Sequence, residues 1–124
     1  MTNTQESVNE ARALADQLID KTQSKKLAWI PTSEYPNDFH VTIDGGFGFT
    51  IYESMDDGFG ISMVDRDGVE LLRAEVESNP KYGYSLSGEQ ALSITLRRLH
   101  ELARRQVLDV DRKVNEARSL LQRL

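Results

Sequence analysis

The sequence contains no cysteine, only two histidines and one tryptophan, and no long run of apolar residues. The absence of cysteine excludes a disulfide framework, a thiolate metal site and thiol catalysis. A transmembrane helix needs about 20 consecutive apolar residues, and no stretch of this chain approaches that length. The first residues show neither the basic region nor the apolar segment of a secretory signal, so we expect the protein in the reducing cytoplasm.

The chain has 124 residues, of which 39% are hydrophobic and 28% charged, and we expect a single domain over residues 1–124. The net charge of −5 is unevenly distributed, with −2 over residues 1–38, −6 over residues 39–87 and +3 over residues 88–124. An acidic total argues against nucleic-acid binding by the chain as a whole. The hydrophobic periodicity changes near the same borders, which indicates three structural layers.

The first segment has the periodicity of an amphipathic helix from about Gln5 to Ser24. Leu27 and Trp29 alternate with polar or small residues before Pro31, which predicts a short strand or a tucked segment. We expect Trp29 to fill the core between the helix and a sheet, as most single tryptophans in such positions do. The residues expected on the apolar stripe of the helix are Val8, Ala11, Ala15, Leu18 and Thr22.

The middle segment alternates between apolar and polar residues with a period of two. Short apolar runs about ten residues apart, separated by turns rich in aspartate and glycine, are typical of an antiparallel meander of four strands. A sheet with one apolar and one polar face needs helices on one side only. The residues expected on the apolar face include Phe39, Val41, Ile43, Phe47, Phe49, Ile51, Phe59, Ile61 and Met63.

The last segment predicts a helix from about Gly88 to Arg105, a break around residues 107–109, and a final helix that begins at Asp109 or Asp111. The fold class is therefore α+β, a four-stranded antiparallel meander covered by an N-terminal helix and two C-terminal helices. The final helix has apolar residues at heptad spacing, which form either a dimer face or a packing surface for the sheet of the same chain. The candidate dimer face consists of Val110, Val114, Ala117, Leu121 and Leu124.

No pattern of residues predicts a catalytic, metal or cofactor site. Asp65 and Asp67 before Gly68 fit a hairpin turn rather than a calcium loop, because the glycine spacing and the final glutamate of such a loop are missing. The glycines of residues 45–48 precede a strand pattern, whereas phosphate-binding loops precede a helix. His40 and His100 lack partners at metal-ligand spacing, and we expect both to be exposed to solvent.

Two groups of residues are candidates for binding a partner. Arginines at i and i+7 spacing lie on one side of the helix over residues 88–105, and two tyrosines flank Gly83 in the preceding loop. The alternatives for the arginines are a solvated helix face, or contact with the acidic sheet of another copy of the chain. The candidate residues are Arg97, Arg98, Arg104, Arg105, Tyr82 and Tyr84.

Three short stretches carry a resemblance, namely residues 26–29 (KLAW), residues 99–104 (LHELAR) and residues 108–111 (LDVD). With the helix and meander between them, they make the chain resemble a group of small uncharacterised bacterial proteins, some of which travel with phages or other mobile elements. The resemblance implies no activity, cofactor or catalytic residue. It implies an accessory protein of bacterial conflict or regulation.

The leading hypothesis is a non-enzymatic module that works through protein–protein contact and forms a homodimer. A second hypothesis is a small-molecule or nucleotide-binding domain, with a pocket between sheet and helices lined by Trp29, Tyr52 and arginines of the helix over residues 88–105. A third is nucleic-acid docking through the basic C-terminal helices, which would weaken steeply with salt.

Overall fold

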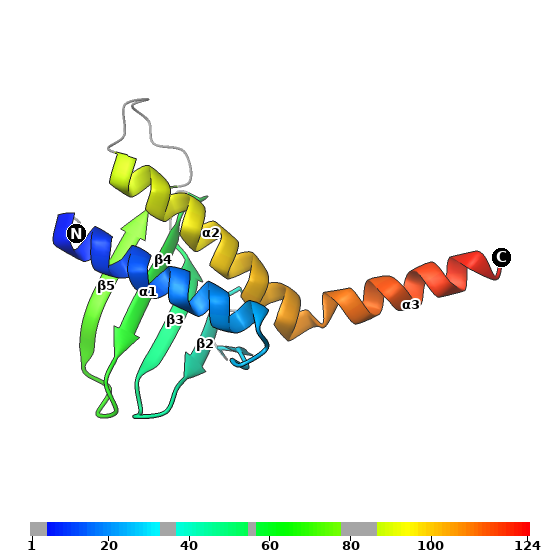
Figure 1. Cartoon of the computed structure of the whole chain (residues 1–124), viewed down its shortest axis with the longest axis horizontal. Helices are drawn as coiled ribbons and strands as arrows, with labels where there is room; N and C mark the ends of the chain where they lie inside the picture. Colours follow the sequence, from blue (N-terminus) through cyan, green and yellow to red (C-terminus); the bar gives the residue numbers. More distant parts are fainter. Residues whose placement is uncertain (1–4, 33–36, 55–56, 78–86) are drawn as a thin grey trace.

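The computed structural model describes residues 5–32, 37–54, 57–77 and 87–124. One helix precedes a five-stranded sheet and two helices follow it (Figure 1). The elements are α1 (Gln5–Gln23), β1 (Ile30–Pro31), β2 (Phe39–Thr42), β3 (Gly48–Glu53), β4 (Phe59–Val64), β5 (Glu70–Val76), α2 (Ser87–Leu108) and α3 (Val110–Gln122).

The strands pair antiparallel and in chain order, β1-β2-β3-β4-β5, which confirms the predicted α+β meander. The strand count is one higher than predicted, because the segment before residue 32 adds a two-residue strand in which Ile30 pairs with His40. Proline has no N–H to donate to a sheet, so Pro31 suits this short edge strand. Between β4 and β5 the register shifts at Met63 and Val64.

Helices α1 and α2 lie on the same face of the sheet (Figure 1). The core between them is built mostly from the alternate apolar positions that the sequence predicts, and all five residues of the expected α1 stripe are buried. The prediction is wrong for Phe47, which directly precedes β3 and is 36% exposed. Core residues that the strands contribute include Phe39, Ile51 and Ile61, and α2 contributes Leu92, Leu96 and Leu99. The apolar side chains that recur every second residue in the strands thus pack against those that recur every 3.6 residues in the helices, and together they form one apolar layer.

The C-terminal end of α1 is closed by a Schellman motif. The N–H of Lys26 donates to the carbonyl of Lys21 at 2.9 Å, and the N–H of Lys25 donates to the carbonyl of Thr22 at 3.1 Å. Lys25 has a φ of 61°, the left-handed conformation that usually falls to glycine at this position. The motif turns the chain back toward the sheet, which positions Trp29.

Trp29 is 4% exposed, as predicted for a residue that fills the core. Its indole N–H donates to Thr22 Oγ1 at 2.9 Å, and the Thr22 hydroxyl donates to the carbonyl of Leu18. The Gln106 side chain of α2 holds the same segment from the other side. Its Oε1 accepts from the backbone N–H of Trp29 at 2.7 Å and its Nε2 donates to the carbonyl of Leu27 at 2.8 Å. The Gln106 side chain therefore makes the two backbone hydrogen bonds that a neighbouring β-strand would otherwise make.

The final helix does not cover the sheet, and this part of the predicted architecture is wrong. Helix α3 has no buried residue and extends away from the body of the molecule (Figure 1). The predicted break is confirmed, because α2 ends at Leu108 and Asp109 has a φ of 54° and a ψ of 45°. A left-handed residue between two right-handed helices redirects the chain, which separates α3 from the sheet.

Candidate interaction surface

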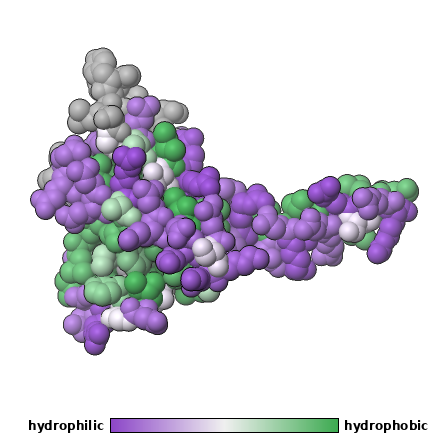
Figure 2. Space-filling model, in the orientation of Figure 1, coloured by the Kyte–Doolittle hydropathy of each residue, from purple (hydrophilic) through white to green (hydrophobic). Residues whose placement is uncertain are grey.

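The most exposed apolar surface of a described helix is one side of α3. We call Val110, Val114, Ala117, Leu121 and Leu124 the α3 stripe, the same residues that the sequence predicts as a dimer face. Leu121 is 66% exposed and Leu124 is 99% exposed, and Leu120 beside them is 54% exposed. Figure 2 shows hydrophobic side chains along one side of the projecting helix and hydrophilic ones along the other. The alternative that this stripe packs on the sheet of its own chain is therefore wrong.

The junction between α2 and α3 is fixed by backbone and side-chain contacts. The N–H of Asp109 donates to the carbonyl of Gln106, and the carbonyl of Asp109 accepts the first hydrogen bond of α3 from Lys113. Two arginine–aspartate ion pairs cross or flank the junction, Arg105 with Asp111 and Arg112 with Asp109. The first raises the pKa of Arg105, because Asp111 accepts a hydrogen bond from the guanidinium and stabilises its charge. These contacts join the first turn of α3 to the end of α2.

The four arginines predicted as a docking surface lie on α2 as two pairs at i, i+7 spacing. Arg97, Arg98 and Arg104 are exposed, and Arg104 pairs with Glu101 at 3.5 Å. Arg105 is half-buried and engaged with Asp111, and it lines a different pocket from Arg104. The structure therefore does not bring the four side chains together into one pocket. Tyr82 and Tyr84, the other candidate contacts, lie outside the described residues.

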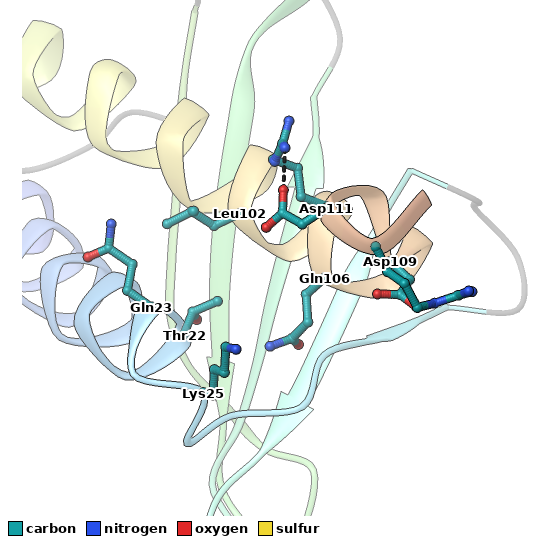
Figure 3. A pocket seen from close by; sticks show the side chains of 9 residues that line it. Thr22, Gln23, Lys25, Leu102, Gln106, Asp109 and Asp111 are labelled. Atoms are coloured by element: carbon teal, nitrogen blue, oxygen red, sulfur yellow. Dashed lines mark hydrogen bonds and ion pairs between the residues drawn. The ribbon is translucent and has the colours of Figure 1, made fainter. Parts of the chain in front are cut away.

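A shallow pocket of about 670 Å³ lies below the junction (Figure 3). Its lining comes from the end of α1, the last turns of α2 and the first turn of α3. Thr22 and Gln106 contribute to its wall, but both are engaged in holding residues 27–29. The dashed contact in Figure 3 is the ion pair of Arg105 with Asp111. The charged groups lining this pocket thus include members of the junction ion pairs.

The pocket predicted between Trp29, Tyr52 and the α2 arginines does not exist in the described structure. Trp29 is buried on the helix-covered side, whereas Tyr52 alternates with buried Ile51 and contacts residues of β5 on the open face. The Tyr52 hydroxyl donates to Glu75 Oε1 at 2.6 Å and accepts from the Arg73 guanidinium at 2.8 Å. Burial and the hydrogen bond to Glu75 raise the pKa of Tyr52 well above its usual range, so the phenol stays protonated and is a poor nucleophile.

His100 is buried, which corrects the prediction that it faces solvent. Its ring lies between Phe39 and Phe59, with centroid distances of 5.3 and 5.0 Å, and its Nε2 donates to the carbonyl of Asn37 at 2.6 Å. Glu53 lies 4.0 Å from the same nitrogen. The imidazole therefore links the segment before β2 to α2 through this hydrogen bond, which is a structural role. His40 is half-buried, and its ring bonds Thr50 on the open face.

Within residues 5–32, 37–54, 57–77 and 87–124, no cluster of three or more histidine, aspartate or glutamate side chains is arranged to hold a metal ion. None of the helices built from these residues combines the length and apolar character needed to cross a bilayer. Comparisons of the chain with models of protein families, with curated proteins and with solved structures found no match.

Proposed function

We propose that the protein is a non-enzymatic interaction module that associates with a second copy of itself through the α3 stripe and acts as a regulatory accessory protein. The observation that carries the proposal is the exposure of α3, a helix of 13 residues with no buried side chain. Helices of this length are marginal in water without tertiary contacts. A stripe of apolar residues at heptad spacing supplies such contacts when a second helix covers it.

The composition of the stripe fits self-association better than contact with an acidic or nucleic-acid partner. Its five residues are apolar, and the charges of α3 are partly neutralised within the chain by the pairs of Arg112 with Asp109 and Glu116. Two α3 helices bury their stripes against each other without leaving an unpaired charge between them. The short length of the helix predicts a weak dimer, with a dissociation constant on the order of micromolar.

Light scattering of the purified chain over a range of concentrations tests the proposal. Leu121→Glu places a charge in the stripe of both copies, and each leucine contributes about 1.5 kcal/mol or more when it is buried. The substitution should weaken the dimer by at least about 100-fold, since two side chains are lost in a symmetric pair. Ser119→Glu adds the same charge on the other side of α3 and is the matched control.

Because α3 has no buried residue, neither substitution should alter the thermal midpoint of the monomer by more than about 2 °C. A wild-type chain that stays monomeric at several hundred micromolar would overturn the proposal. An unchanged dimer in the Leu121→Glu variant would show that the stripe is not the contact.

A further inference from the structure

We infer that the two α3 helices pair antiparallel, with Val114 of one copy beside Ala117 of the other, an inference that rests on the self-association proposed above. The argument is the charge of the residues that flank the stripe. With Val114 and Leu121 at heptad position a, and Val110, Ala117 and Leu124 at position d, each flanking residue has a defined place. Asp111 and Arg118 occupy position e, and Lys113 and Leu120 occupy position g.

A parallel pair brings like charges together. In that orientation a g residue of one helix faces the e residue five positions later on the other, so Lys113 faces Arg118 of the second copy. The two-fold symmetry of the dimer repeats this contact, and two cation pairs at the edges of a short interface oppose association.

An antiparallel pair brings opposite charges together. Position e then faces position e, which places Asp111 beside Arg118 of the second copy, and symmetry again repeats the contact. Position g faces position g, which places the stem of Lys113 beside the exposed Leu120. Asp111 is 83% exposed although it pairs with Arg105, and a carboxylate has a second oxygen to accept from Arg118.

Charge also selects the register. A shift of one heptad that brings the tips of the two helices closer would place Arg118 opposite Arg118. In the register with Val114 beside Ala117, Leu121 lies opposite Val110 and Leu124 comes level with the end of α2, where Leu108 is 42% exposed. The two sheets then lie at opposite ends of a helix pair whose length is about 20 Å, since α3 has 13 residues.

Because the chain has no cysteine, two single-cysteine variants test the orientation directly. Val110→Cys and a size-tagged Leu121→Cys are mixed at equal concentration and treated with a short bis-maleimide. The antiparallel pair predicts mixed crosslinked dimers and few dimers of Leu121→Cys alone, since two Leu121 positions are separated by about 16 Å along the axis. A parallel pair predicts crosslinked dimers of Leu121→Cys alone and few mixed dimers.

A charge reversal gives an independent readout by light scattering at low salt. Arg118→Glu should weaken the antiparallel dimer about tenfold, because two attractive pairs become repulsive, and added salt should reduce the effect. The same substitution would strengthen a parallel dimer, where the introduced carboxylate would face Lys113, so tighter association overturns the inference. Arg123→Glu, which makes the same charge change outside the e and g positions, is the control and should leave the dimer unchanged. Parallel crosslinks in a dimeric protein overturn only the orientation, whereas a monomeric wild-type chain overturns both the orientation and the proposed function.

Discussion

Replacing Gln106 by alanine removes the side-chain bridge between α2 and the segment of residues 27–29. Both hydrogen bonds are short, 2.7 Å to the N–H of Trp29 and 2.8 Å to the carbonyl of Leu27. A hydrogen bond contributes about 1 kcal/mol net, and more when its loss leaves a buried group without a partner. Trp29 is 4% exposed, so water reaches its N–H poorly, whereas Leu27 is half-buried. We expect the free energy of unfolding to fall by about 2 to 3 kcal/mol.

Tryptophan fluorescence during urea unfolding is the natural assay, because Trp29 is the only tryptophan and lies at the site of the change. For a domain of this size the loss corresponds to a fall in thermal midpoint of about 8 to 12 °C. Gln122→Ala makes the same substitution at an exposed position of α3 and should change stability by less than about 0.5 kcal/mol. If Gln106→Ala unfolds within that range of the wild-type chain, the bridge does not hold the segment and our interpretation is wrong.

Two further predictions concern the helix end and the open face. Lys25→Gly should stabilise the fold by about 0.5 to 1 kcal/mol, because glycine adopts a φ of 61° without the steric cost that lysine bears. Lys26→Gly is the control and should not stabilise the fold. Urea unfolding measures the free energy of unfolding of both variants. The pKa of Tyr52 is raised in the folded state, so its contribution to stability is complete below pH 10 and is lost as the pH rises further. Thermal midpoints between pH 8 and 11 should therefore fall less in Tyr52→Phe than in the wild-type chain, and equal slopes would refute the assignment.

The periodicity of the sequence was sufficient to predict the α+β class, the extent of α1 and the apolar face of the sheet. These features depend on the spacing of many apolar residues, so no single position decides them. The break around residues 107–109 was also predicted, and α2 ends at Leu108.

The same pattern did not reveal where α3 lies. A heptad stripe is identical whether it covers the same chain or another one, and the left-handed conformation of Asp109 that redirects the helix has no strong signal in a residue other than glycine. His100 was misplaced for a related reason. A polar residue next to a stripe is expected in solvent, but here a single backbone carbonyl, that of Asn37, satisfies its ring nitrogen within the core.

Gln106 shows the limit of pattern-based prediction most clearly. Its partners at Leu27 and Trp29 are nearly 80 positions away in the sequence, with separations of 79 and 77 residues. A single glutamine near the end of a helix carries no periodic signal, and its role follows only from the return of the chain beside α2. Contacts of this kind depend on the tertiary fold, which local propensity does not encode.

The fixed junction at Asp109 also has a consequence for the kinetics of association. A flexible tail must be ordered when it binds, and the entropy lost then reduces affinity and slows the productive encounter. The backbone bonds and the two arginine–aspartate pairs already hold the first turn of α3, so the costly nucleation of the helix takes place during folding. The later turns of the helix become ordered from this first turn when the second copy binds, so the rate of association should depend on diffusion and charge steering and on the completion of the helix.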